Sequence, residues 1–265
     1  MVVKQRKRSA SVMANDQDLL PVIREIKADH PSWGYRRVHS YLPYRKAIVI
    51  GKNRVYRILK ENNLLALSCR KLKACRTFGR SKPRTNQPNT IWGIDMTKVA
   101  VDSWGWLYLH VLKDWGSKKI VGWTLSPQSK TTDWLEALQS ALNAEFPDGI
   151  READSKLKLI SDNGCQPTSA NFMAACSVLH IEQIFTSYNN PKGNADTERV
   201  FRTMKEDLIW LHDWTSYQQL QNALNQWIND YNHDFIHSSL GAKITPAQYH
   251  HNNLIKHNKT SFISL

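Results

Sequence analysis

Apolar residues follow a helical period in the first quarter of the chain and a different pattern afterwards. Three stripes of apolar side chains at helical spacing lie between residues 15 and 67, and they predict three short helices. The stripes comprise Leu19, Leu20, Val22, Ile23 and Ile26, then Val38, Tyr41 and Leu42, and finally Val55, Ile58 and Leu59. Residues 47–50, between the last two helices, are compatible with a strand or with a turn.

From Thr90 onward the pattern indicates a mixed α/β structure. Apolar and β-branched runs predict three strands joined by tight turns, which would form an antiparallel meander. Strands and segments of helical period then alternate. The expected strands cover residues 91–101, 106–114, 119–125, 157–161 and 181–186. The expected helices cover residues 132–146 with Thr131 or Thr132 as cap, 169–180, a segment that begins near Asp196, and the amphipathic segment 216–231.

Positive charge is concentrated in the N-terminal third. The chain has 36 Lys and Arg against 23 Asp and Glu, a formal net charge of +13. Residues 1–90 hold 21 of these cations against 5 acids, a net charge of +16, so the remaining residues carry −3. A positive segment binds phosphate backbones of any sequence through the release of counterions, so we expect a polyanion as partner. The alternative is that the basic residues only aid solubility.

No segment of the sequence predicts a membrane helix. No run approaches the roughly 18 apolar residues of a spanning helix, and the basic start is not followed by the apolar stretch of a signal peptide. The four cysteines do not have the spacing of a disulfide framework, and His30, His39, Cys69 and Cys75 do not have that of a zinc module. We therefore expect a cytoplasmic protein without structural zinc.

Three acidic residues stand out by their surroundings. Asp95 interrupts a predicted buried strand and Asp162 ends another, although a carboxylate taken out of water needs a cation or hydrogen-bond donors. Glu198 falls in the first turn of the helix that begins near Asp196. Each residue alone has an ordinary interpretation: the aspartates as turn residues, and the glutamate as a solvated helical residue paired with Arg202.

In combination with their neighbours, these acids resemble a known family. The motifs are Trp92-Gly93-Ile94-Asp95-Met96-Thr97, Ser161-Asp162-Asn163-Gly164, a gap of 35 residues before Glu198, Gly193-Asn194-Ala195, and Lys205 seven residues after the glutamate. Further motifs are Trp33-Gly34-Tyr35-Arg36-Arg37-Val38, Tyr231-Asn232, His237-Ser238-Ser239-Leu240-Gly241 and Thr245-Pro246-Ala247. The chain is similar to the DDE transposases of two-reading-frame bacterial insertion sequences, whose catalytic core is similar to retroviral integrase. Phe235-Ile236 and Arg199 depart from the family pattern.

The resemblance implies an α/β fold with a ribonuclease-H-like mixed sheet and flanking helices, preceded by a small all-helical module like a helix-turn-helix. In that fold Asp95 on the first strand and Asp162 at the end of the fourth are neighbours. The expected organisation is a basic disordered tail at 1–15, a helix-turn-helix-like DNA-binding module at 16–67, a basic linker at 68–90, an integrase-like catalytic core with a C-terminal helix at 91–250, and a tail at 251–265.

The resemblance also implies the chemistry. Asp95, Asp162 and Glu198 would be the catalytic residues and metal ligands, and ligands that are all hard oxygens select Mg²⁺ or Mn²⁺, with two ions in the site. The reaction would be DNA cleavage and strand transfer at insertion-sequence ends. Expected partners are the DNA of the element ends and of the target, further copies of the chain on that DNA, and the product of an upstream reading frame. The expected location is the bacterial nucleoid.

Two groups of residues are candidates for DNA contacts. Arg202 and Lys205 follow Glu198 at i+4 and i+7 on one helix face, and other candidates lie in the loop before this helix and in the helical module. The full set is Arg36, Arg37, Lys52, Arg54, Arg57, Lys192, Asn194, Arg202 and Lys205. Two other functions stay open: a transposase-derived DNA-binding regulator with an inactive core, and a ribonuclease-H-like nuclease. The intact acid triplet disfavours the first, and the charged N-terminal module disfavours the second.

Overall fold

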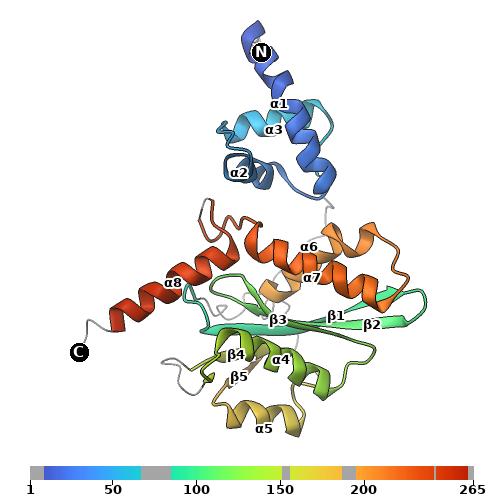
Figure 1. Cartoon of the computed structure of the whole chain (residues 1–265), viewed down its shortest axis with the longest axis vertical. Helices are drawn as coiled ribbons and strands as arrows, with labels where there is room; N and C mark the ends of the chain where they lie inside the picture. Colours follow the sequence, from blue (N-terminus) through green and yellow to red (C-terminus); the bar gives the residue numbers. More distant parts are fainter. Residues whose placement is uncertain (1–8, 67–84, 151–155, 187–194, 242, 262–265) are drawn as a thin grey trace, which may run out of the picture. The chain divides into compact units, whose positions relative to one another are not determined.

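The structure is a computed structural model that describes residues 9–66, 85–150, 156–186, 195–241 and 243–261. The chain divides into two compact units, residues 1–74 and 75–265 (Figure 1). Most of the predicted linker at 68–90 lies outside the described residues, and so do residues 1–8 of the predicted N-terminal tail. In the described part of the chain, no helix is long and apolar enough to cross a membrane.

Three helices form the N-terminal unit: α1 Ala10–Asp29, α2 Tyr35–Arg45 and α3 Lys52–Glu61. Their apolar stripes meet in a small core that includes Ile23, Val38, Leu42, Val55 and Leu59, all fully buried. Helix α1 begins earlier than the sequence indicated, so that residues 10–15, which we expected in a disordered tail, are helical. This stretch contains two alanines and neither Gly nor Pro, so nothing in it opposes a helix.

Residues 47–50 form an irregular turn and not a strand. Ala47 has a positive φ of 53°, which a strand does not accommodate. The N–H of Ile48 donates to the carbonyl of Leu42 at 3.1 Å, so the chain folds back on the end of α2. The turn then brings the chain to Gly51, the N-cap of α3.

A five-stranded mixed sheet with the order β3-β2-β1-β4-β5 forms the centre of the C-terminal unit. The strands are β1 Ile91–Val101, β2 Gly105–Asp114, β3 Ile120–Ser126, β4 Lys158–Ser161 and β5 Glu182–Phe185. The first three form the predicted antiparallel meander, and β4 and β5 follow in parallel beside β1. This confirms the ribonuclease-H-like topology that the resemblance implied.

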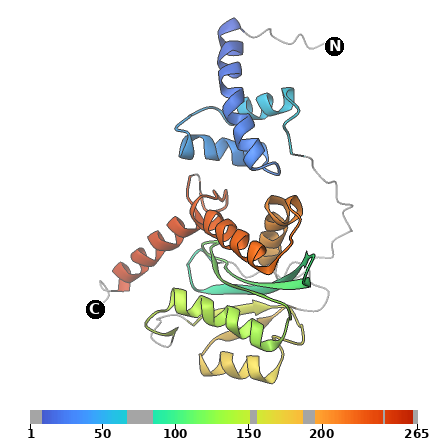
Figure 2. The same cartoon turned by 45° about the vertical axis from the view of Figure 1, so that its right-hand side comes forward.

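Helices cover both faces of the sheet (Figure 2). One face carries α4 Thr131–Glu145 and α5 Ala170–Val178, and the other carries α6 Ala195–Asp207 and α7 Tyr217–His233. The start of α4 differs from the prediction, because its N-cap is Lys130 and not a threonine. Asp133 in the first turn accepts from the N–H of Lys130 at 2.6 Å, which supplies the cap from inside the helix.

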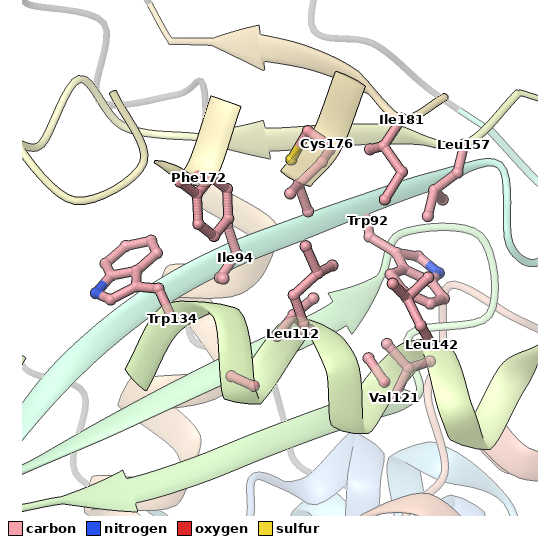
Figure 3. Packing of buried hydrophobic residues seen from close by; sticks show 14 residues of the cluster. Trp92, Ile94, Leu112, Val121, Trp134, Leu142, Leu157, Phe172, Cys176 and Ile181 are labelled. Atoms are coloured by element: carbon pink, nitrogen blue, oxygen red, sulfur yellow. The ribbon is translucent and has the colours of Figure 1, made fainter. Parts of the chain in front are cut away.

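The main hydrophobic core lies between the sheet and the layer of α4 and α5 (Figure 3). Its large side chains include Trp92, Ile94 and Leu112 from the sheet, Trp134 and Leu142 from α4, and Phe172 and Cys176 from α5. Gly122 of β3 allows the close approach of α4, since a Cβ there would lie 2.6 Å from that of Ala141. The core therefore holds β1 and β4, the strands associated with the two aspartates, in fixed positions.

The last two helices pack against β3 and the turn before it. In α7, the Asn232 side chain bonds both the N–H and the carbonyl of Ile120, at 2.9 and 3.0 Å. Helix α8, Pro246–Ser261, occupies most of the region where we expected a tail. Its start is capped by Thr245, whose hydroxyl accepts from the N–H of Gln248 at 3.3 Å, and proline stands at the first helical position.

Candidate active site

The parallel pairing of β1 with β4 brings two of the predicted acids together. Ile91 pairs with Lys158, Trp92 with Leu159 and Gly93 with Ile160. When this register is continued by two residues along the direction of both strands, Asp162 falls beside Asp95. Asp162 directly follows the last residue of β4, so it lies at the carboxyl end of a central strand while Asp95 lies within β1.

Asp95 lies in an environment that disfavours its negative charge. Burial raises the pKa of Asp95 to about 7, and the charges of Asp162 and Glu198 also raise it, whereas the N–H of Met96 and the Lys205 ammonium lower it. The Met96 N–H donates to this carboxylate at 2.8 Å. Asp162 and Glu198 therefore lie close enough to act electrostatically on Asp95, and a bound cation would offset the repulsion between these charges.

A short turn after β4 fixes the backbone around Asp162. The carboxylate of Asp162 accepts from the N–H of Gly164 at 3.1 Å. Asn163 reaches across to donate its side-chain amide to the carbonyl of Thr186, just after β5. Gly164 suits this turn because a Cβ there would lie only 3.0 Å from the Asp162 carboxylate. The Asp162 side chain itself is exposed, so it stays accessible to a ligand.

Glu198 is presented by the first turn of α6, which is anchored to β2 and the turn after it. The buried Lys113 of β2 donates to the carbonyl of Asp196 at 2.9 Å. The Lys118 ammonium lies 3.6 Å from the Asp196 carboxylate. The indole N–H of Trp115 donates to the Thr197 hydroxyl at 3.4 Å. These contacts hold the two residues before Glu198, while its own side chain is exposed.

The donor set fits a hard divalent cation. All three side chains offer carboxylate oxygens, which Mg²⁺ and Mn²⁺ prefer, and none offers nitrogen or sulfur. In the described residues no three His, Cys, Asp or Glu side chains are already grouped closely enough to hold a metal ion. Binding would thus require the exposed side chains of Asp162 and Glu198 to turn toward the half-buried Asp95.

The basic candidates near the acids have different surroundings. Lys205 lies close enough to Asp95 to lower the pKa of that carboxyl group. Arg202 instead pairs with Glu206 on the exposed side of α6, at 2.8 Å. Lys192 and Asn194, the two candidates in the preceding loop, lie outside the described residues.

In the N-terminal unit, the basic candidates separate into two groups. Asp16 accepts from Arg54 at 2.6 Å and from Arg57 at 2.5 Å, so these two guanidinium groups join α3 to α1. The other candidates, Arg36, Arg37 and Lys52, lie near the N-termini of α2 and α3. Arg36 and Lys52 are exposed, and the guanidinium of Arg37 lies 5.6 Å from the ring of Trp33.

Comparison with known proteins agrees with this arrangement. Residues 85–191 and residues 179–246 each match an integrase core domain family, and residues 14–72 match a family of HTH-like domains. Transposase InsF for insertion sequence IS3A, from Escherichia coli (strain K12), is 29% identical over 168 residues, which are 63% of this chain and 56% of InsF. Over residues 85–246 the chain thus matches the integrase core domain, and it is similar to the IS3-type transposases.

The relatives differ in how much of their length this chain matches. It spans about half the length of InsF. The uncharacterized 31 kDa protein of insertion element IS600 from Shigella sonnei is 26% identical over 240 residues, 85% of each chain. A chain in the cryoEM structure of the simian T-cell lymphotropic virus intasome with PP2A regulatory subunit B56 gamma has a TM-score of 0.54, with 20% identity over 86% of this chain and 74% of that chain. That likeness supports the fold alone.

Two residues that hold charged neighbours in place were missed by sequence reasoning. Asp16 binds two arginines that we had considered free for DNA, and Lys113 holds the start of α6. Asp16 had no local signal, because its partners are distant in sequence. Lys113 offered a hint, since a lysine inside an apolar strand needs an acceptor, but the sequence did not identify that acceptor.

Proposed function

We propose that this chain is a transposase that cleaves DNA at the ends of an insertion sequence and joins the freed ends to a target. The observation that carries this proposal is the position of Asp162 and Glu198 near the buried Asp95 of an integrase-like core, near enough for both charges to add to the effect of burial in raising the pKa of Asp95. A bound cation stabilises carboxylates that repel one another in their ionised forms, so the arrangement suits a metal-dependent reaction.

In this proposal the three carboxylates hold Mg²⁺ or Mn²⁺, two ions in all. When bound, such ions activate the attacking oxygen and stabilise the leaving oxygen during in-line displacement at phosphorus. Asp95 serves in its ionised form, anchored by the N–H of Met96. Lys205, close to Asp95, is placed to contact a phosphate of the bound strand.

The proposed reaction has two steps that need no covalent enzyme intermediate. In the first, water attacks a phosphodiester, the P–O3′ bond breaks, and the leaving oxygen takes a proton to become a free 3′-OH. In the second, this 3′-OH attacks a phosphodiester of the target, forming a new P–O bond and releasing another 3′-OH. Both steps exchange one oxygen for another at phosphorus, so a single site serves both.

DNA recognition is assigned to the N-terminal unit and its basic surroundings, since residues 1–90 carry a net charge of +16. As the family resemblance implies, the proposed partners on DNA are further copies of the chain and the product of an upstream reading frame. Within the helical unit, the exposed Arg36 and Lys52 are better placed for phosphates than Arg54 and Arg57, which Asp16 engages.

The type of product separates transposition from the alternatives. The chain would be incubated with a labelled duplex that ends in the terminal repeat, an unlabelled target duplex and Mn²⁺. The proposal expects nicked DNA and a longer joined product. A nuclease would give only shortened strands and would also cut RNA–DNA hybrids, and an inactive DNA-binding regulator would shift the duplex in a gel without cutting it.

A further inference from the structure

A buried group of charged and polar residues connects α8 to the end of β2. His250, in the second turn of α8, is 3% exposed. Its Nδ1 shares a hydrogen bond with the Ser117 hydroxyl at 2.9 Å, and its Nε2 lies 2.7 Å from a carboxylate oxygen of Glu145. Ser117 in turn donates to Asp114, from its hydroxyl at 2.5 Å and from its N–H at 2.7 Å. The imidazole thus lies between two carboxylates from different elements.

Residues outside α8 supply the remaining hydrogen bonds of this group. Lys119 donates to Glu145 at 2.6 Å, and the N–H of Asn89 donates to Asp114 at 3.1 Å. Burying two carboxylates is unfavourable unless they are paired and hydrogen-bonded, so these contacts are needed for Asp114 and Glu145 to be accommodated. The group lies outside the set of acids assigned to catalysis, and the proposed chemistry does not use it.

The β2–β3 turn, residues 115–119, connects this group with α6. Ser117 faces His250, while its neighbours Trp115 and Lys118 contact Thr197 and Asp196 of α6. Lys118 also donates to the carbonyl of Trp115 at 2.5 Å, which makes the turn a compact unit. The turn packs tightly on the segment before β1, because a Cβ on Gly116 would lie 2.2 Å from the carbonyl oxygen of Gln87. A turn so tightly packed transmits a displacement on one side to the other.

We propose that Ser117 and His250 are positioning residues that fix Glu198 through the β2–β3 turn, so that docking of α8 completes the catalytic site. The inference rests on the proposed function in assigning a metal-binding role to Glu198. Its structural part, the dependence of the α6 start on α8, stands independently. Glu198 follows Asp196 and Thr197 directly, so a shift of the turn moves the backbone that presents its carboxylate.

Ser117→Ala is the decisive variant. It removes the hydroxyl that joins His250 to Asp114, yet it leaves the Ser117 N–H and the His250–Glu145 contact in place. His250→Ala is the second variant, and Tyr249→Phe is the matched control. Tyr249 belongs to the same helix, and the hydroxyl that the variant removes donates to the carbonyl of Asn86 at 3.1 Å, outside the turn.

Two measurements apart from DNA cleavage test the inference. The first is the rise in melting temperature on titration with Mn²⁺, which reports metal affinity. The second is amide hydrogen exchange at residues 195–200 of α6. We expect Ser117→Ala to raise the Mn²⁺ concentration for half-maximal stabilisation by roughly 2- to 30-fold, the usual range for changes along a chain of contacts. We also expect faster exchange in α6, with both quantities unchanged in Tyr249→Phe.

The double variant Ser117→Ala/His250→Ala should show the same metal affinity as the single variants, because both residues act through one connection. The inference would be overturned if Ser117→Ala matched the wild type in Mn²⁺ affinity and in exchange at α6. If the wild type neither bound Mn²⁺ nor cleaved DNA, the proposed function would fail. The exchange measurement would then decide alone whether α8 positions the start of α6.

Discussion

Asp162 lies beside Asp95 because β4 pairs with β1 in parallel, and both side chains belong to the face of the sheet that α6 covers. Gly93 and Ile160 form the last pair of this register. Since side chains alternate along a strand, residues two positions further return to the same face. Ile160 packs on that face with Trp115, whose indole contacts α6. Glu198, which α6 carries, therefore approaches the two aspartates from the face of the sheet to which their side chains belong.

The N-terminal arginines should separate into structural and DNA-contacting residues. Arg36→Ala and Lys52→Ala should each weaken DNA binding and lower the slope of log affinity against log salt by roughly 0.9, without lowering the melting temperature. Arg54→Ala and Arg57→Ala should destabilise the unit by on the order of 1–3 kcal/mol, because each removes a charged hydrogen bond to Asp16. Asp16→Asn is the control and should destabilise likewise. Competition binding across a salt series, combined with thermal unfolding, measures both effects. The assignment would be wrong if Arg57→Ala changed the slope of log affinity against log salt and left the melting temperature unchanged.

Separate fragments should divide recognition from chemistry. Residues 75–265 form a compact unit with its own core and should fold alone, yet bind DNA weakly, because most of the positive charge lies before them. Residues 1–89 should bind DNA with a steep salt dependence. Circular dichroism and fluorescence anisotropy measure the two properties. Equal DNA affinity of the catalytic fragment and the full chain would contradict this division.

Acid should remove a specific contribution of Glu145 to stability. Burial raises the pKa of Glu145, but the neighbouring His250 and Lys119 outweigh this effect and lower the pKa to about 2, from its usual value of 4.5. A depressed pKa stabilises the fold above the unfolded value, and this contribution is lost as the pH falls from about 4.5 toward 2. The difference in unfolding free energy between wild type and Glu145→Gln should be on the order of 3 kcal/mol at pH 7 and shrink by pH 3. Urea unfolding at both pH values measures it, and a difference that grew in acid would refute the assignment.

Metal choice should follow the oxygen ligands. Cleavage should occur with Mg²⁺ or Mn²⁺ and be suppressed when Ca²⁺ replaces them, because the larger and looser calcium shell misplaces the reacting oxygens. DNA binding measured in parallel controls for loss of the complex. Activity that persisted in a chelator, or that required Zn²⁺, would be incompatible with an all-carboxylate site.

The sequence predicted the secondary-structure elements correctly where the local pattern of residues alone determines them. The strand at 91–101 has the predicted bounds, because apolar and β-branched residues extend over the whole segment. Helix α8 was missed, although Thr245-Pro246 is a good start signal, because the residues after it are polar and show no apolar stripe. Its contacts with the rest of the unit include those of a buried histidine, His250, whose partners come from other elements.

Long-range contacts of charged residues were the least predictable feature of the site. Asp16 and its two arginines are about 40 positions apart, and Lys113 is more than 80 positions from Asp196. No local signal specifies such pairs, since a charged residue with helical or strand spacing has many potential partners. The three acids could be proposed from the sequence because Asp95 interrupts a predicted strand, while Asp162 and Glu198 fall at the ends of recognisable elements. The contacts that position Glu198 had no such signal.

The most direct test of the central claim is DNA cleavage by Asp95→Asn, Asp162→Asn and Glu198→Gln, compared with Glu182→Gln. Glu182 is an exposed acid of β5 that pairs with Lys158 at 3.5 Å, so its substitution changes the same charge outside the site. We predict that each of the three variants loses cleavage and strand transfer by at least about 100-fold while DNA affinity stays within about 2-fold of the wild type, and that Glu182→Gln stays active. Cleavage at the wild-type rate by any of the three would contradict its place in the mechanism.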